Sequence, residues 1–209
     1  SLADAGINNI FLETYYHGKT IFPSQTMAKY GFIKQNEEFC GFDPLRVWVN
    51  EAHKRGIKVH IWFETFYVGN KPPETNPEYI LAKKPGWANY QKRNAESGNI
   101  VYSVSEHNGY FIDPANPEVQ QFLYELLSEI ITRYKPDGIN LDYIRYPQSY
   151  ASNYPTYDLS NWGYTKYARQ EFKNMYGVDP MDIKTTDPLW YHWKYYRCNK
   201  VTNFVKKAS

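Results

Sequence analysis

The stretch from Lys135 to Pro147, KPDGINLDYIRYP, constrains the fold more than any other part of the chain. It is typical of one buried strand. A turn at residues 136–138 leads in, apolar residues recur, and Pro147 ends the ladder because proline has no N–H to donate. Alternation along a strand places Asn140 and Asp142 on the same face. A carboxylate near the end of a buried strand is costly, which points to chemistry or to cation binding.

Two earlier segments, residues 7–15 and 57–66, are predicted to be strands with the same sorting of side chains. A period of two residues separates a polar and aromatic face from an apolar face. The first face comprises Phe11, Glu13, Tyr15, His60, Trp62, Glu64, Asn140 and Asp142. The second face comprises Ile10, Leu12, Thr14, Val59, Ile61, Phe63, Ile139, Leu141 and Tyr143. We expect the first face to point inward, away from the helices.

Helical periodicity and capping residues follow each predicted strand. Helices are predicted over residues 43–56, 116–135, 162–176 and 187–204. The resulting order of strand, helix, strand, helix, strand and helix predicts an α/β fold with parallel strands joined by helical crossovers.

The lengths of the connections carry the functional argument. The strand-to-helix connections are long, whereas the helix-to-strand turns are only a few residues. In a (β/α)8 barrel the active site is built from the loops that follow the strands, so Glu13, Glu64 and Asp142 would gather at one rim. An open doubly wound sheet also binds ligands at strand ends. However, no glycine-rich phosphate loop follows any of these strands, which disfavours nucleotide binding.

Composition excludes several classes of partner. The net charge is +2 with lysine and arginine scattered, which predicts no nucleic-acid partner. No apolar run is long enough to span a membrane, and two cysteines are too few for a disulfide scaffold or a zinc cluster. The aromatic share of 18%, with 21 tyrosines, is high. It is typical either of a core rich in rings or of platforms that stack on sugar faces.

Three separated blocks resemble a known family. They are EAHKRGIKVHIWF at residues 51–63, DPANPEV at residues 113–119 and DGINLDYIRYP at residues 137–147. In this order they are similar to the glycosyl-hydrolase-like family 10, also called DUF187, from residue 5 to about residue 205. The resemblance implies part of a (β/α)8 TIM-type barrel with long loops at the carboxyl ends of its strands. It also implies a glycoside hydrolase acting on a bacterial polysaccharide, with peptidoglycan glycan strands as one candidate, in a secreted, periplasmic or cell-envelope protein without a cofactor.

Only three strands are predicted here, whereas such a barrel has eight. We therefore expect residues 1–209 to be a single domain that holds roughly the second to fourth βα units, with the remaining barrel strands elsewhere in the same full-length protein. The strands around Ile10 and Ile139 should then have unpaired edges, and the helices should cover one face only.

Cleavage of a glycosidic bond needs two carboxyl groups beside it. The candidates are Asp142, Glu64 and Glu13, with Asp142 as nucleophile or base and Arg145 close enough to hold it ionised. Asn140, Arg145, Tyr146, His60, Trp62 and Tyr15 are expected to bind the oligosaccharide or polysaccharide, with Trp87 and Tyr90 as further stacking rings. The alternative for Asp142 and Arg145 is a structural ion pair. The alternative for the two glutamates is simple hydrogen bonding to sugar hydroxyls.

Two other functions fit the same residues. A carbohydrate-binding barrel without catalysis would keep the aromatic residues and lose one carboxylate. A hydrolase dependent on a divalent metal would use Glu13, Glu64, Asp142 and His60 as ligands. No His-x-His or His-Glu-x-x-His spacing supports zinc, and His60 is more typical of a hydrogen-bonded core or binding histidine than of a metal ligand. We therefore expect no metal.

Overall fold

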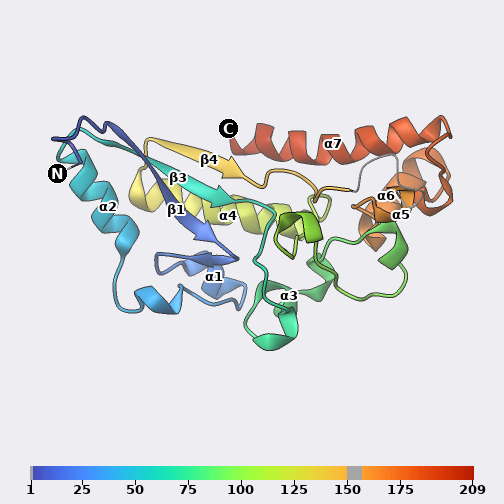
Figure 1. The fold of residues 1–209 in the computed structure, drawn as a ribbon, viewed down its shortest axis with the longest axis horizontal. Helices are drawn as coiled ribbons and strands as arrows, with labels where there is room; N and C mark the ends of the chain where they lie inside the picture. Colours follow the sequence, from blue (N-terminus) through green and yellow to red (C-terminus); the bar gives the residue numbers. More distant parts are fainter. Residues whose placement is uncertain (1, 150–156) are drawn as a thin grey trace.

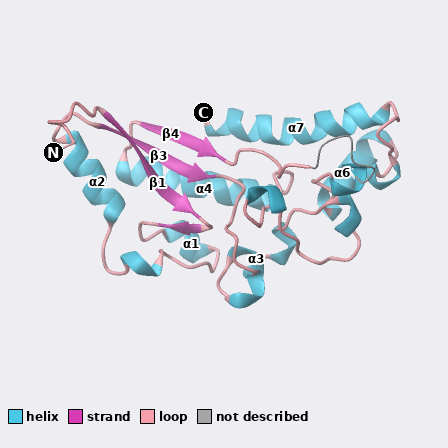
Figure 2. Ribbon diagram, viewed as in Figure 1, coloured by secondary structure: helices cyan, strands magenta, loops and turns pink. Residues whose placement is uncertain are grey.

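The computed structural model describes residues 2–149 and 157–209, and a sheet with the strand order β2-β1-β3-β4 lies at its centre. The strands are β1 (Asn9–Tyr16), β2 (Lys19–Thr20), β3 (Lys58–Glu64) and β4 (Gly138–Asp142). The three long strands run parallel with β3 between the other two, and β2 folds back antiparallel onto the end of β1 (Figure 2). The predicted parallel order is therefore confirmed.

Helical crossovers join these strands, as the sequence predicted. Helix α2 (Pro44–His53) connects β1 to β3, and helix α4 (Pro117–Tyr134) connects β3 to β4 (Figure 1). Each begins with a side-chain cap and a proline: Asp43 accepts from the Arg46 N–H at 3.0 Å, and Asn116 from the Glu118 N–H at 2.9 Å.

The apolar face of the sheet forms the main core. Val59, Ile61 and Phe63 of β3 have no exposed surface and belong to the same cluster as the inward faces of α2 and α4. Burial of such side chains stabilises the fold by about 1.5–3 kcal/mol each. The opposite face remains open, since Phe11 is 59% exposed and Asn140 is exposed. The helices thus cover one face of the sheet, as predicted.

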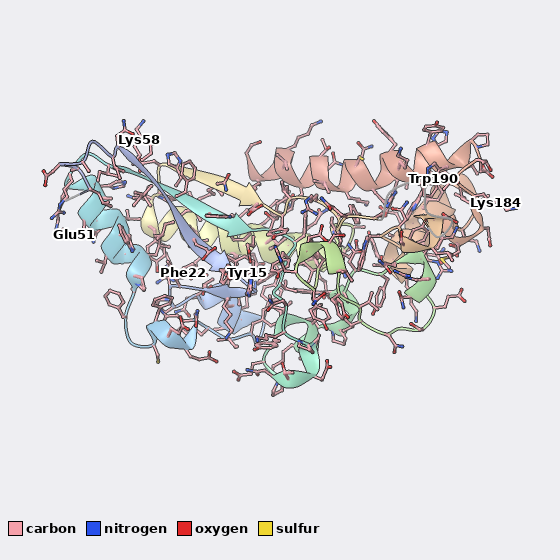
Figure 3. All side chains as sticks on the ribbon, in the orientation of Figure 1. Tyr15, Phe22, Glu51, Lys58, Lys184 and Trp190 are labelled. Carbon is pink, nitrogen blue, oxygen red and sulfur yellow. The ribbon has the colours of Figure 1, made fainter. Side chains whose placement is uncertain are left out.

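A second cluster lies at the other end of the molecule. Helix α6 (Lys166–Tyr176) packs there against the first half of α7 (Leu189–Ala208), with Trp193 in contact with Tyr164 and Phe172. Figure 3 shows Trp190 in this cluster and Glu51 at the opposite end. Helix α7 then leads back to the main core, where Phe204 stacks on Tyr124 of α4 at 4.8 Å. Neither α7 nor any other helix within the described ranges is long and apolar enough to cross a membrane.

The long connections are more regular than predicted. We expected no periodic structure between β1 and α2 or between β3 and α4, but these segments contain α1 (Gln25–Lys29) and α3 (Ile80–Lys83), and α5 (Tyr157–Ser160) follows β4. Helices of four or five residues are too short to leave a hydrophobic period in the sequence, and tertiary contacts stabilise them.

Both outer strands have open edges in the described part of the chain. Ile10 of β1 pairs only with Val59, and Ile139 of β4 pairs only with Ile61. Short β2 covers β1 only at Tyr15 and Tyr16. The sheet is therefore a partial α/β arrangement, and these residues do not close into a barrel.

Glu129 ties the loop after β1 to helix α4. Its carboxylate accepts hydrogen bonds from the Ser24 hydroxyl at 2.7 Å, the Gln25 N–H at 2.8 Å and the Thr26 N–H at 2.9 Å. Burial raises the pKa of Glu129, but these hydrogen bonds outweigh it and hold the pKa below its ordinary value of 4.5. One carboxylate thus satisfies the first N–H groups of α1.

We predict that Glu129→Ala lowers the free energy of unfolding by about 2 kcal/mol, because two partly buried donors and one exposed donor lose their acceptor. The loss should be full at neutral pH and should shrink as the pH falls below about 4.5, where the stabilising carboxylate of the parent protein becomes protonated. Denaturant unfolding at several pH values measures this. Glu125→Ala, which removes an exposed pair with Lys29 one turn earlier, should cost less than about 1 kcal/mol. Equal losses in the two variants would contradict this account.

Candidate active site

Three carboxylates lie at the carboxyl ends of the parallel strands. The register pairs Glu64 directly with Asp142 and pairs Glu13 with Trp62, so the three side chains share the face that the helices leave uncovered. Each of the three acts electrostatically on at least one of the other two. Glu13, Glu64 and Asp142 therefore lie on the sheet face opposite the helices, as alternation along the strands predicted.

Glu64 is the most buried of the three, with 5% of its surface exposed. Its Oε2 accepts a hydrogen bond from the His17 N–H at 2.7 Å. Burial and the negative charges of Glu13 and Asp142 raise the pKa of Glu64 to about 7, although the His17 hydrogen bond opposes this rise. Near neutral pH this carboxyl group is therefore present in both its protonated and its ionised form.

Asp142 is fixed by two donors. The Trp62 indole Nε1 donates to Oδ2 at 2.9 Å, and the Tyr143 N–H donates to Oδ1 at 2.7 Å. Both are N–H groups, which can only donate. They hold the carboxylate in one orientation on the open face of the sheet. Trp62 therefore does more than fill space, since its ring positions Asp142.

Glu13 differs from Glu64 in its access to water, since it is exposed. Its pKa is nevertheless raised, first by partial burial and then by the charge of Asp142. Three carboxyl groups that influence one another do not ionise independently. The arrangement can therefore hold one proton beside ionised carboxylates, which is the state that acid and base catalysis requires.

Tyr15 does not face inward, which corrects the sequence prediction. Glu13 pairs with Trp62 but Tyr15 pairs with Phe63, so β1 carries an extra residue at this point. The bulge turns Tyr15 toward the helices, where it has no exposed surface and stacks on Phe63 at 4.7 Å. Tyr16 takes its place on the open face. It is 39% exposed, and burial and the charges of Glu13 and Glu64 raise its pKa.

His60 shares the open face but does not join the carboxylates. It lies four residues before Glu64, which is roughly 13 Å along a strand. Its ring stacks on Phe11 at 4.8 Å and contacts the Asn9 side chain at 2.9 Å. It also occupies the space that any side chain at Gly138 would need. The four ligands of the metal hypothesis are thus not brought together, and no group of three or more potential metal ligands occurs within residues 2–149 and 157–209.

Arg145 does not pair with Asp142, contrary to prediction. Its guanidinium lies 2.6 Å from Glu106, and the Gln148 N–H donates to the same carboxylate oxygen at 2.9 Å. Glu106 is 2% exposed and belongs to the loop before α4. The sequence offered no signal for Glu106, because the path of that loop decides which carboxylate Arg145 meets. This ion pair anchors the segment that leaves β4.

The remaining predicted binding residues divide into exposed and buried groups. Asn140 is exposed beside Trp62 on the open face. The hydroxyl of Tyr146 is buried without a hydrogen-bond partner among the described residues, next to Gly163 and Arg197, so its polar end is not presented to a ligand. Two further rings were expected to stack on sugar, Trp87 and Tyr90. Trp87 is 2% exposed in the main core, whereas Tyr90 is half-buried.

A row of four aromatic rings borders the carboxylates, and the sequence did not predict it. Tyr16 stacks on His17 at 3.9 Å, His17 meets Tyr67 at 5.3 Å, and Tyr67 stacks on Tyr143 at 4.6 Å. Alternation placed Tyr143 on the helix side, but its φ of +46° interrupts the strand geometry directly after Asp142. Burial, followed by the charges of Glu64 and Asp142, raises the pKa of Tyr143.

The sequence matches a family model over its whole length. The model is described as Glycosyl hydrolase-like 10, and it matches residues 1–209. The chain is 32% identical to glycosyl hydrolase DigH of Escherichia coli K12 over 151 residues. This aligned region covers 69% of this chain and 32% of that protein. It is 27% identical over 139 residues to glycosyl hydrolase YngK of Bacillus subtilis, covering 65% of this chain and 24% of that protein. The matched region thus spans about a third or less of these relatives.

Two solved structures share the fold. A hypothetical protein from Ruminiclostridium thermocellum aligns with 99% of this chain and 80% of its own at a TM-score of 0.60 and 15% identity. Alpha-L-fucosidase isoenzyme 2 from Paenibacillus thiaminolyticus aligns with 99% of this chain and 26% of its own at a TM-score of 0.58 and 21% identity. At these identities the likeness concerns the fold alone.

The raised pKa of Glu64 predicts a pH-dependent stability. Protonated Glu64 is favoured in the folded state, so its stabilising effect is complete below pH 4.5 and is lost as the pH rises through about 7. Between pH 5 and 8 the free energy of unfolding of the parent protein should fall by up to about 3 kcal/mol relative to that of Glu64→Gln, whose side chain keeps the shape and cannot ionise. Denaturant unfolding across this range measures the difference. Parallel profiles for the two proteins would show that Glu64 ionises normally.

Proposed function

This chain belongs to the Glycosyl hydrolase-like 10 family, and from this premise we propose that the intact protein is a glycoside hydrolase. The observation that carries the proposal is the group of Glu13, Glu64 and Asp142 at the ends of neighbouring parallel strands. Their surroundings differ, since Glu64 is buried with a raised pKa while Asp142 is held by two N–H donors. Carboxyl groups with divergent environments are the usual basis of acid and base roles in glycosidases.

Within this proposal Asp142 and Glu64 have distinct tasks. Asp142 acts as the nucleophile or as the base that activates water, because both its oxygens are oriented by donors that cannot accept a proton. Glu64 supplies the proton to the leaving oxygen, since its pKa of about 7 keeps part of it protonated at neutral pH. Glu13 lies beside them and favours the protonated state of Glu64 through its negative charge.

We propose that residues 1–209 form a single domain that holds roughly the second to fourth βα units of a TIM-type barrel. Strands elsewhere in the intact protein complete this barrel. The open edges of β1 and β4 support this, because exposed edges pair readily with further strands. The greater length of the relatives supports it as well. Closure would bring other loops over the face that carries Asp142.

We propose a bacterial polysaccharide as substrate, with peptidoglycan glycan strands as the preferred candidate. The partly exposed Tyr16 and the ring row behind it support a sugar substrate, since aromatic rings offer rigid apolar surfaces that stack on sugar faces. Such a substrate would place the intact protein in the cell envelope or outside the cell.

Asp142→Asn tests the catalytic role. The amide is nearly isosteric, so the fold should persist, but it can neither attack nor take a proton, and turnover should fall by at least about a thousandfold. The assay is release of reducing ends from peptidoglycan glycan strands by the intact protein, with circular dichroism as a check on folding.

Asn140→Ala is the matched control for Asp142→Asn. Asn140→Ala alters an exposed residue of the same strand and should affect substrate affinity while turnover at saturation persists. If the parent protein binds the glycan and releases no reducing ends, the binding-barrel alternative replaces the hydrolase. Normal hydrolysis by Asp142→Asn would remove Asp142 from the mechanism.

Trp62→Phe tests whether the indole N–H positions Asp142. The ring is retained and one hydrogen bond to a charged group is lost, so kcat should fall about tenfold with little change in KM. Trp48→Phe is the control, because Trp48 is 41% exposed on α2 and should leave the kinetics unaltered. A rise in KM with an unchanged kcat would assign Trp62 to substrate binding instead.

A further inference from the structure

A pocket of about 240 Å³ lies at the end of β1. It is lined by Tyr16 and His17, the residues that directly follow the bulge of β1, and the His17 N–H donates to Glu64. Sites for drug-sized ligands span roughly 300–1,000 Å³, so this pocket fits one small ring rather than several. None of the residues proposed above for catalysis lines it.

The base of the pocket is rigid. His17 has a φ of +50° and is followed by Gly18 at +72°, and the turn packs against a second turn at Gly69. A Cβ at Gly69 would lie 3.2 Å from the His17 Cβ, and one at Gly18 would lie 3.1 Å from the Val68 carbonyl oxygen. Unusual backbone geometry persists only where surrounding contacts enforce it. The pocket is therefore formed before any ligand arrives, which lowers the entropic cost of binding.

The lining suits an uncharged polar ligand. Two lysines, Lys19 and Lys71, and two glutamates, Glu37 and Glu38, line the pocket, so their formal charges balance. Lys19 is neutralised by Glu37 at 3.1 Å. Burial and the two lysines lower the pKa of His17, which keeps its ring uncharged at neutral pH.

Hydrogen-bonding groups and aromatic rings line the same pocket. Asn36 and Asn70 contribute amides, Lys71 an ammonium group, and Tyr16 and Tyr79 contribute rings with hydroxyls. A sugar ring presents the complementary combination, with apolar C–H faces and hydroxyl groups that both donate and accept. An isolated cation or anion would find no excess of opposite charge here.

We propose that this pocket is a subsite for one neutral sugar residue of the glycan whose scissile bond lies over Glu64 and Asp142. The inference rests on the proposed glycosidase function and adds the position of the neighbouring sugar. Tyr16 lines the pocket and lies within the electrostatic influence of Glu13 and Glu64, so the sugar in the pocket is the one next to the reacting residue along the chain. Substrates that reach the pocket bind more tightly than shorter ones.

The experiment measures binding without turnover. Intact protein carrying Asp142→Asn is titrated calorimetrically with fragments of peptidoglycan glycan strands from two to eight sugars long. Affinity should rise about tenfold at the length that first fills the pocket, which corresponds to one or two good hydrogen bonds and a stacked ring. Adding Asn70→Trp, which fills the pocket with an indole, should abolish that rise and leave the affinity of the shortest fragment unchanged.

Lys71→Ala, which removes one donor, should reduce the rise about threefold and not abolish it. Lys206→Ala removes an exposed lysine at the far end of α7 and is the matched control, with no expected effect. A length dependence that Asn70→Trp leaves intact overturns the subsite, even if the parent protein cleaves glycan. If Asn70→Trp removes the length dependence but the parent protein never cleaves glycan, the hydrolase proposal is overturned and the subsite is retained. Absence of binding at every length overturns both.

Discussion

The parallel pairing of β3 with its two neighbours is the constraint on which the site depends. Burial of one face fixes this pairing, because Val59, Ile61 and Phe63 have no exposed surface. A shift by one residue would expose these side chains and bury the polar set of the other face. The energy that holds the register therefore comes from the side of the sheet opposite to the carboxylates. On the open side, this register places Glu64 and Asp142 directly beside each other.

The bulge in β1 extends this arrangement. By turning Tyr15 into the core it anchors the end of the strand, and it releases Tyr16 and His17 to the rim. The left-handed geometry of His17 then aims its N–H at Glu64. A single extra residue thus connects core packing with the hydrogen bond that orients a buried carboxyl group. It also brings Tyr16 and His17 to the wall of the adjacent pocket.

The sequence predicts features that depend on neighbouring residues, and it misses features that depend on contacts between distant parts of the chain. The faces of Glu64 and Asp142 were predictable because alternation along a strand is local. Tyr15 was misplaced because a bulge reverses alternation and leaves no residue signature here. The partner of Arg145 was misassigned because Glu106 lies 39 residues away, on a loop whose path depends on tertiary contacts. Tyr146 and Trp87 look like surface rings in the sequence, and only packing reveals that the Tyr146 hydroxyl and the Trp87 ring are buried.

The two glutamates show why burial, rather than charge alone, selects the proton carrier. Both lie near Asp142 and both have raised pKa values. Glu13 is exposed, so water stabilises its ionised form and limits the rise. Glu64 is 5% exposed, and one N–H from His17 cannot replace the lost hydration. Burial therefore raises the pKa of Glu64 to about 7. Because the same open face keeps Asp142 oriented by Trp62, the sheet places a carboxyl group of raised pKa beside a fixed carboxylate.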